Sequence, residues 1–329
     1  MTHPDDAPIP WRSIPIQDIL DAKGESLALE LLTPGVPLDR LASDPDISSP
    51  GLALAGYTDR VAEGRMWVFG ETEMTYLQTL TEGEARDRLD SIFAFDVPAV
   101  FVTKGLPVPE AFLTRAAAHA IPVLRSGVTT KHFYQRIKPF LEAALAPTTT
   151  LHGSLADVYG IGLLFVGESG VGKSECVLDL VERGHRLVAD DLVLTSRRGT
   201  DVLIGRGHPR QRHHMEIRGI GIIDIPTAFG IRSVRQQKRI EVVVNLELWD
   251  QERTYSRTGL EEEWETILGV RIPRVTVPLN PGKNITVISE VVAMNHLLKY
   301  AGINSAVAFD NHLKDSMRPV RDYLEQDYE

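Results

Sequence analysis

One stretch of sequence decides the fold of this chain: Gly167-Glu168-Ser169-Gly170-Val171-Gly172-Lys173-Ser174. It fits the pattern G-x-x-x-x-G-K-[ST], in which a glycine-rich loop joins a buried strand to a helix and wraps a phosphate group. The flanks fit as well, because the apolar run 161–166 predicts a buried strand and residues 173–183 predict a helix. A plain glycine-rich turn is the alternative, but correct flanks on both sides favour a nucleotide site.

The residue types in this loop suit phosphate binding. Glycine adopts backbone conformations that are closed to residues with side chains, so consecutive N–H groups can converge on one cluster of phosphate oxygens. The helix that follows points its positive end at the same place. Lys173 adds a positive charge at the β- and γ-phosphates, and the Ser174 hydroxyl is placed to ligate Mg²⁺. The loop therefore predicts a nucleotide site with magnesium.

Composition limits the class of protein. With 329 residues, 43% of them hydrophobic, the chain can bury a substantial core and has the length of about two domains. The net charge of −10 argues against a nucleic-acid or membrane-surface binder, because either needs a basic face. We find no signal peptide and no apolar run near the ~20 residues that span a membrane. The only cysteine, Cys176, excludes an internal disulfide, which fits the cytoplasm, and we expect it to be a packing residue.

The chain divides into two patterned halves. Residues 1–10 are acidic and contain proline, and they are predicted to be a disordered tail. Residues 11–146 alternate strands with helices, which predicts an α/β domain with a partly parallel sheet. Ala146-Pro147-Thr148-Thr149-Thr150 is interpreted as a linker, because small polar residues and one proline separate the halves. Residues 147–329 are predicted to form a P-loop domain with a mixed, strand-rich sheet.

Individual elements are predicted from hydrophobic periodicity and β-propensity. In the first half we expect strands at 26–32, 66–69, 99–103 and 123–125, helices at 16–22, 71–80, 81–92, 109–119 and 130–145, and mostly loop at 33–50. In the second half we expect strands at 160–166, 186–194, 201–204, 220–225, 240–248 and 271–277, and a helix at 288–300 that closes the domain.

Two adjacent carboxylates, Asp190 and Asp191, follow the apolar residues 187–189. In a phosphate-loop fold the neighbouring strand ends beside the nucleotide, so an acid there can hold Mg²⁺ or accept a proton from the attacking group. Two acids allow both jobs. Side chains alternate across a strand, so only one of the pair is expected to face the site squarely. A solvated turn is the alternative, and the independently predicted location favours function.

Three further residues are candidates that the pattern alone leaves open. His152, in Leu151-His152-Gly153-Ser154, would more often be a packed or capping histidine than a catalyst. Glu216 lies in an alternation of charged and apolar residues that a half-buried strand would also show, and its functional interpretation is a second Mg²⁺ ligand. Arg257 is a candidate for stabilising phosphoryl charge, although by spacing alone it is a loop arginine.

Several segments together resemble bacterial HPr kinase/phosphorylase. In the second half they are His152-Gly153, Asp157-Val158-Tyr159-Gly160, Gly167 to Glu175, Arg183 to Asp191 and Met215-Glu216-Ile217-Arg218-Gly219 through Asp224. In the first half they are Pro50 to Tyr57 and Ile121 to Ser126. The combination is highly specific, and the resemblance covers nearly the whole chain.

The resemblance implies a bifunctional, cytoplasmic enzyme that regulates the phosphotransferase system and carbon metabolism. Its kinase direction would move the γ-phosphoryl of ATP to a serine of the phosphocarrier protein HPr, and its reverse function would use inorganic phosphate and release pyrophosphate. The resemblance also implies a homohexamer whose C-terminal domains carry the catalysis.

By matching motif, the resemblance assigns roles to single residues. The active-site positions would be His152, Lys173, Asp191 and Arg257, the magnesium ligands Ser174 and Glu216, and the nucleotide loop 167–174. Asp191 would accept the serine proton during phosphorylation and return one during phosphorolysis. Asp190 is then the further carboxylate available to Mg²⁺.

One segment departs from the pattern that we expect of the family, Pro-Val-Arg-Pro-Gly-Arg-Asn. This chain has Pro278-Leu279-Asn280-Pro281-Gly282-Lys283-Asn284, so Asn280 and Lys283 replace two arginines. The segment is tied to dephosphorylation in the family. Lysine loses bidentate phosphate binding and asparagine also loses the charge, so we expect kinase activity to be retained and phosphorolysis to be weak.

Two other classes of function compete with this interpretation. A P-loop kinase of another protein or of a small molecule is one of them, and incubation with ATP and HPr would distinguish it. A non-catalytic regulator that senses ATP is the other, and the two aspartates count against it because a pure sensor needs no base. A GTPase is disfavoured, since we find no Asn-Lys-x-Asp motif.

Overall fold

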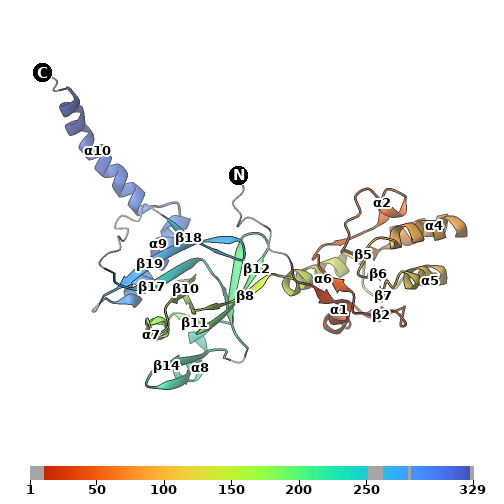
Figure 1. Cartoon of the computed structure of the whole chain (residues 1–329), viewed down its shortest axis with the longest axis horizontal. Helices are drawn as coiled ribbons and strands as arrows, with labels where there is room; N and C mark the ends of the chain where they lie inside the picture. The colour runs from red at the N-terminus through yellow and green to blue at the C-terminus, as the bar shows by residue number, and fades with distance from the viewer. Residues whose placement is uncertain (1–10, 210, 251–261, 281–282, 327–329) are drawn as a thin grey trace. The chain divides into compact units, whose positions relative to one another are not determined.

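The computed structural model describes residues 11–209, 211–250, 262–280 and 283–326 (Figure 1). The predicted disordered tail at 1–10 and the candidate Arg257 lie outside these residues. The chain forms two compact units, of which one ends at Pro147 and the other begins at Thr148. Within the described residues, no helix combines the length and the apolar character needed to cross a membrane.

The N-terminal unit is built on a five-stranded sheet in the order β2-β7-β6-β5-β4. The chain runs parallel from β4 to β7, and β2 pairs antiparallel at one edge. The strands of the unit are β1 (Ile14–Pro15), β2 (Leu29–Leu31), β3 (Leu41–Ala42), β4 (Ile47–Ser48), β5 (Met66–Phe69), β6 (Val100–Val102) and β7 (Val123–Ser126), with β1 and β3 forming a separate pair.

Helices cover both faces of this sheet. One face packs against α2 (Gly51–Leu54), α3 (Glu71–Thr79), α4 (Glu82–Phe93) and α5 (Glu110–Ala118), and the other against α1 (Ile16–Lys23) and α6 (Thr130–Ala144). Trp67 and Phe69 of β5 belong to the first core and Met66 and Val68 to the second. Because both faces are covered, this strand is apolar throughout instead of alternating.

The C-terminal unit contains a six-stranded mixed sheet in the order β11-β9-β10-β17-β19-β18. The strands are β9 (Ser154–Val158), β10 (Ile161–Gly167), β11 (Arg186–Ala189), β17 (Val242–Leu248), β18 (Glu263–Ile267) and β19 (Val270–Leu279). β10, β17 and β19 pair parallel, β9 and β18 are antiparallel to their neighbours, and β11 is antiparallel to β9. β10, β11, β17 and β19 therefore all point the same way and end at one edge.

Two layers enclose this sheet. One face forms a core with α7 (Lys173–Glu182) and α9 (Ile285–Tyr300), and the other packs on a second, antiparallel sheet in the order β16-β13-β12-β8. The remaining elements are β8 (Thr148–His152), β12 (Leu192–Arg198), β13 (Val202–Gly207), β14 (His214–Ile217), β15 (Gly221–Asp224), β16 (Gln237–Arg239), α8 (Ile225–Phe229), the 3-10 turn η2 (Ile231–Ser233) and α10 (Ser305–Gln326).

The predicted fold class is confirmed, and three expectations about single elements are wrong. Thr148–Thr150 is not linker but part of β8, because its β-branched residues pair with β12. The strand expected at 186–194 is two strands in two different sheets, β11 and β12. The segment 33–50 is mostly loop, as predicted, and is interrupted by the two-residue strands β3 and β4. The helix at 288–300 does not close the unit, since α10 follows it.

Candidate active site

The candidate residues gather at the edge where the parallel strands of the C-terminal unit end. The glycine-rich loop leaves β10, the aspartate pair leaves β11, and the segment with Asn280 leaves β19. β9 runs antiparallel and begins at this edge, so His152 and Gly153, which precede it, lie there too. The carboxyl edge of parallel strands is where α/β sheets bind ligands. Segments far apart in the sequence are thus brought to one place by the sheet.

The glycine-rich loop has the backbone that its sequence predicts. Gly167, Gly170 and Gly172 have φ values of 140°, 83° and 100°, in the region that favours glycine. Gly172 is also the N-cap of α7, and no side chain caps this helix. The free N–H groups of the first turn therefore remain available to a bound anion.

Lys173 and Ser174 begin α7 directly after the loop. The Lys173 Nζ donates to the carbonyl oxygens of Gly167 at 3.0 Å and Glu168 at 2.8 Å, so the ammonium group lies over the loop. The Ser174 Oγ donates to Asp190 Oδ1 at 3.0 Å. The loop and the end of β11 are therefore in direct contact.

Asp190 is the buried member of the aspartate pair. Its Oδ1 accepts hydrogen bonds from Ser174 and from the buried Ser154, whose Oγ lies at 2.5 Å. Burial raises the pKa of the Asp190 carboxyl, and the two hydroxyl donors oppose that effect. Ser154 was missed by the sequence reasoning, since nothing in a lone serine at the start of a strand marks it.

Asp191 turns the chain from one sheet into the next. Its φ of 63° is left-handed, a conformation that costs most non-glycine residues about 1 kcal/mol and that aspartate tolerates better than others. The turn leaves the Asp191 side chain exposed, while its carbonyl accepts from the N–H of Gly153 at 3.0 Å. Exposure leaves this carboxylate open to a group that arrives from outside the chain.

His152 is held next to this turn. It is exposed at the end of β8 and is the Cα partner of Leu192, which follows Asp191. The next residue must be glycine, because a Cβ on Gly153 would lie 2.3 Å from the carbonyl oxygen of Phe165 on β10. The backbone therefore brings His152 and Asp191 close to the end of β10, the strand that leads into the glycine-rich loop.

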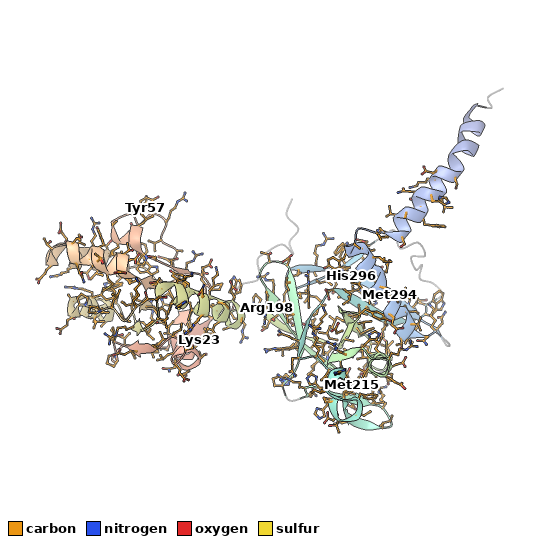
Figure 2. All side chains as sticks on the ribbon, turned by 180° about the vertical axis from the view of Figure 1, so that it is seen from behind. Lys23, Tyr57, Arg198, Met215, Met294 and His296 are labelled. Carbon is orange, nitrogen blue, oxygen red and sulfur yellow. The ribbon has the colours of Figure 1, made fainter. Side chains whose placement is uncertain are left out.

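Glu216 is on the β14–β15 hairpin, whose half-buried alternation matches the sequence pattern. Met215 and Ile217 are in the core while Glu216 is exposed (Figure 2 labels Met215). The hairpin reaches the loop through Arg218, whose Nη2 lies 3.5 Å from Ser169 Oγ. No contact joins Glu216 to Ser174 or Asp190, and the described residues contain no cluster of three or more His, Cys, Asp or Glu that could hold a metal. Arg218 therefore places a positive charge at the loop. The sequence motif contains this arginine but did not indicate its role.

The segment 278–284, which differs from the pattern expected of the family, is held by contacts within the chain. The Lys283 Nζ donates to the Pro278 carbonyl at 3.0 Å and lies 5.7 Å from the centre of the Trp249 ring. The Lys283 N–H donates to the carbonyl of Asn280 at 3.1 Å. The one positive charge of this segment is thus held by contacts with its own neighbours.

Other residues of the recognised motifs serve as scaffold. The buried Asp157 accepts from Arg235 Nη1 at 2.7 Å. Arg183 and His185 both contact Glu290 of α9, each at 3.1 Å. These contacts connect α9 and β9 to the rest of the unit, so the motifs around 157 and 183 maintain the frame of the site.

The residues present fit a nucleotide and Mg²⁺. The loop offers positive-φ glycines, an uncapped helix end and Lys173, which together suit a chain of phosphates. The Ser174 hydroxyl beside the Asp190 carboxylate is an oxygen pair of the kind that Mg²⁺ prefers, and P-loop sites complete the shell with water and phosphate oxygens. This edge therefore has the parts of a phosphoryl-transfer site.

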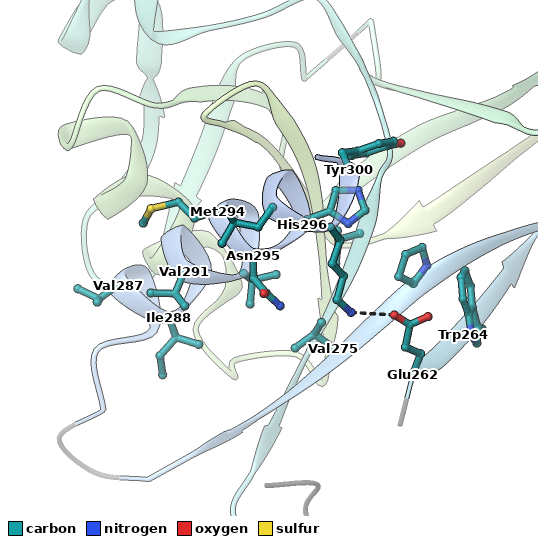
Figure 3. Close-up of a pocket in the computed structure, with 15 residues that line it drawn as sticks. Glu262, Trp264, Val275, Val287, Ile288, Val291, Met294, Asn295, His296 and Tyr300 are labelled. Atoms are coloured by element: carbon teal, nitrogen blue, oxygen red, sulfur yellow. Dashed lines mark hydrogen bonds and ion pairs between the residues drawn. The ribbon is translucent and has the colours of Figure 1, made fainter. Parts of the chain in front are cut away.

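An apolar hollow of the C-terminal unit lies away from this edge. It measures about 670 Å³ and is lined mainly by apolar side chains of α9, β18 and β19, among them Trp264, Val275 and Val291 (Figure 3). None of the candidate catalytic residues lines it. We therefore place the chemistry at the strand edge and not in this hollow.

The fold and the edge define a P-loop phosphotransferase. Comparison with known proteins makes this more specific. Residues 143–313 match the HPr Serine kinase C-terminal domain, and residues 14–141 match the HPr Serine kinase N terminus. The chain belongs to the HPr kinase/phosphorylase family.

Its relatives include two proteins named HPr kinase/phosphorylase. The one from Halalkalibacterium halodurans is 45% identical over 291 residues, and the one from Bacillus subtilis is 43% identical over 291 residues. In both cases the match covers 88% of this chain and 94% of the relative. The Hpr(Ser) kinase/phosphatase from Coxiella burnetii is 32% identical, with a TM-score of 0.44, over 49% of this chain and 98% of that one.

Proposed function

We propose that this chain phosphorylates a serine of the phosphocarrier protein HPr with ATP, and that it can reverse the modification with inorganic phosphate, releasing pyrophosphate. Through HPr it would regulate the phosphotransferase system and carbon metabolism from the cytoplasm. The observation that carries the proposal is the contact of Ser174 with Asp190 at 3.0 Å, which joins the phosphate loop to the aspartate pair.

Each residue at the edge has a task in this reaction. The loop N–H groups and Lys173 bind the β- and γ-phosphates. A serine hydroxyl is a poor nucleophile, so the exposed Asp191 takes its proton as the new bond forms and returns it in the reverse direction. His152, next to Asp191, and Arg257 complete the set by stabilising charge on the transferring group.

Ser174, Asp190 and Glu216 would hold Mg²⁺. When bound, the ion would neutralise charge on the phosphate oxygens. Ser154 and Ser174 keep Asp190 oriented while it is buried. Glu216 would have to act from the hairpin, which Arg218 ties to the loop.

The proposal includes a homohexamer. The hollow on α9 supports an assembly, because Val291, Met294 and Leu298 are each at least 40% exposed along it (Figure 3). Exposed apolar side chains that lie together are typical of protein interfaces. Replacing Val291 with Glu should lower the mass measured by light scattering, while an unchanged mass would remove this surface from the assembly.

The experiment that tests the function is phosphotransfer with labelled ATP and purified HPr, followed by addition of phosphate. Asp191→Asn should lower the rate of phosphotransfer to HPr 10²- to 10⁴-fold, which is the contribution that a general base typically makes. Its affinity for the nucleotide should stay unchanged. If Asp191→Asn transferred phosphate at the wild-type rate, the assignment of the base would be wrong. The wild type could instead leave HPr unlabelled and transfer the phosphoryl group of ATP to another acceptor or to water. That result would favour the alternative of a different kinase substrate.

A further inference from the structure

Two large apolar side chains stand exposed where β17 ends, on the same edge as the phosphate loop. Leu248 is 69% exposed and Trp249 is 44% exposed. β17 is the strand directly beside β10, and its register pairs Leu246 with Gly167, the first residue of the loop. The approach is close, because a Cβ on Gly167 would collide with the carbonyl oxygen of Leu246. The aromatic ring of Trp249 therefore belongs to the phosphate edge, although no step of the proposed reaction uses it.

The neighbouring strand β19 holds Trp249 at this edge. The Trp249 N–H donates to the carbonyl of Leu279 at 3.1 Å, and the Lys283 Nζ lies 5.7 Å from the centre of the indole ring. Trp249 follows Leu246 by three residues, which at the rise of a strand is about 10 Å. The ring thus stands beyond the loop, with room for a sugar between it and bound phosphates. Because its backbone is already held, the ring loses little freedom when a flat group stacks on it.

The reacting groups lie on the other side of the loop. The strands of this sheet follow the order β11-β9-β10-β17-β19-β18, and the loop leaves β10. Asp191 follows β11 and His152 precedes β9, so the exposed carboxylate and the imidazole belong to the β9 side of the loop, whereas Trp249 belongs to the β17 side. A triphosphate that lies along the loop with its γ-phosphate toward Asp191 therefore directs its other end, which carries the nucleoside, toward Trp249.

We propose that Trp249 is the base-binding residue of the nucleotide site, and that its indole ring stacks on the purine of the bound triphosphate. The inference rests on the proposed function, because it takes ATP as the phosphoryl donor. Every base has a flat π-face, so stacking on an aromatic side chain holds a base without reading the hydrogen-bonding groups of its edge. The site is therefore expected to accept adenine and guanine with similar affinity. The large indole ring suits a purine, because it offers more contact area than a single ring.

A second copy of the chain is the other molecule that could cover this ring, and two observations favour the base. The Lys283 ammonium group beside the ring suits a ligand that carries phosphate better than it suits an apolar protein surface. The hollow on α9 offers a copy a continuous apolar lining away from the loop, whereas Trp249 and Leu248 are only two side chains (Figure 3). The ring is therefore better matched to a single flat group than to a protein.

The test is calorimetric titration of the full chain with Mg²⁺ and either a non-transferring ATP analogue or inorganic triphosphate, which has the phosphates and lacks the base. Wild type should bind the analogue about tenfold more tightly than triphosphate. Trp249→Leu keeps an apolar side chain and removes the π-face, so it should weaken the analogue about tenfold and change the affinity for triphosphate less than twofold. Trp249→Phe keeps an aromatic ring and should retain most of the affinity. Tyr57→Leu, at an exposed aromatic residue of the other unit, is the control and should leave both affinities unchanged (Figure 2).

The reverse reaction supplies a second control within the same protein, because inorganic phosphate and pyrophosphate carry no base. In Trp249→Leu, KM for ATP in the kinase direction should rise about tenfold. KM for phosphate in the dephosphorylation of phosphoserine-HPr should stay within about twofold of the wild-type value, since the phosphates contact the loop and not the ring.

The outcomes separate the failures. If wild type binds the analogue no better than triphosphate, or if Trp249→Leu binds the analogue as tightly as wild type, the inference is overturned. Equal weakening of the analogue and triphosphate would mean that the ring supports the loop and not the base, which also overturns it. A loss of mass by light scattering with unchanged affinities would place the ring between copies instead. If wild type binds the analogue as expected but does not phosphorylate HPr, the base site stands and the proposed function fails.

Discussion

Both units of this molecule end parallel strands at an edge where helices begin, yet the charged and capping groups at the two edges are engaged differently. In the N-terminal unit, the Glu73 carboxylate accepts from the Gly70 N–H at 2.9 Å at the start of α3. Thr129 caps α6 by accepting from the His132 N–H at 3.4 Å, and Lys104 is paired with Glu71. At these two helix starts the chain supplies its own acceptors, and the Lys104 charge is paired, whereas α5 begins at Pro109 without a side-chain cap.

The edge in the C-terminal unit is arranged in the opposite way. Helix α7 begins at Gly172 without a side-chain cap, and Lys173 donates only to backbone carbonyls. The nearby carboxylate, Asp190, contacts the Ser174 hydroxyl instead of the helix N–H groups. Although Glu175 lies in the first turn of α7, no side chain caps the N–H groups of this turn, so they remain available to a phosphate.

The comparison predicts its largest effect for the two lysines. Lys173→Ala should lower the rate of phosphotransfer to HPr about 10²- to 10³-fold, because it removes a charge that stabilises the transferring group. Lys104→Ala removes a lysine at the corresponding edge and should leave this rate within about twofold, because that ammonium group is already paired with Glu71. The measurement is kcat with saturating ATP and HPr.

Equal losses in both variants would break the comparison, since the N-terminal edge would then take part in the chemistry. The thermal unfolding temperature of each variant serves as the control for folding.

The next effect concerns the departing segment after β19. Restoring both arginines, Asn280→Arg with Lys283→Arg, should raise the rate of phosphate-dependent dephosphorylation of phosphoserine-HPr about tenfold and leave the kinase rate unchanged. Arginine binds phosphate with two parallel hydrogen bonds, whereas Lys283 now donates to the Pro278 carbonyl. The amount of pyrophosphate released reports the reaction. Wild-type rates that are comparable in both directions would refute the expectation of weak phosphorolysis.

The part of the site that is continuous in sequence could be predicted, and the part made by pairing could not. Strand β10, the loop and α7 follow from local pattern, because glycine, lysine and serine each have a requirement that is visible in one short stretch. Ser154 and Arg218 could not be placed, since their positions depend on which strands pair. The same holds for β8, whose threonines have the composition of a linker and form a strand only by pairing with β12.

The aspartate pair shows both sides of this. Asp190 is buried and Asp191 is exposed, but both lie in the turn between β11 and β12, so alternation along a strand does not account for the difference. The break between two sheets at Asp191, with its φ of 63°, depends on long-range packing and has no local signal.

A smaller effect is expected from Ser154→Ala. The variant removes one of the two hydroxyl donors to Asp190, a hydrogen bond with a net value of about 1 kcal/mol. The Mg²⁺ concentration for half-maximal kinase rate should rise about fivefold, and the affinity of the Mg²⁺–nucleotide complex should fall in proportion. Ser126→Ala in the N-terminal unit is the matched control, because that buried serine donates to the Leu27 carbonyl at 2.6 Å. It should lower thermal stability without changing the dependence on Mg²⁺.

The smallest effect is expected at Cys176, which tests how far the open end of α7 influences its surroundings. A thiol in the first turn of a helix would ordinarily have a lowered pKa and react readily. Here the thiol is 4% exposed and packs against Ser289, and burial raises its pKa to about 11. The thiol therefore stays protonated at neutral pH, and the thiolate forms only as the pH rises toward that value. Native protein should be alkylated by iodoacetamide at pH 7.5 much more slowly than the unfolded chain, as measured by mass spectrometry. Rapid labelling of the native protein would mean that the positive end of α7 lowers the thiol pKa by more than burial raises it. It would also mean that reagents reach the first turn of α7 beyond Ser174.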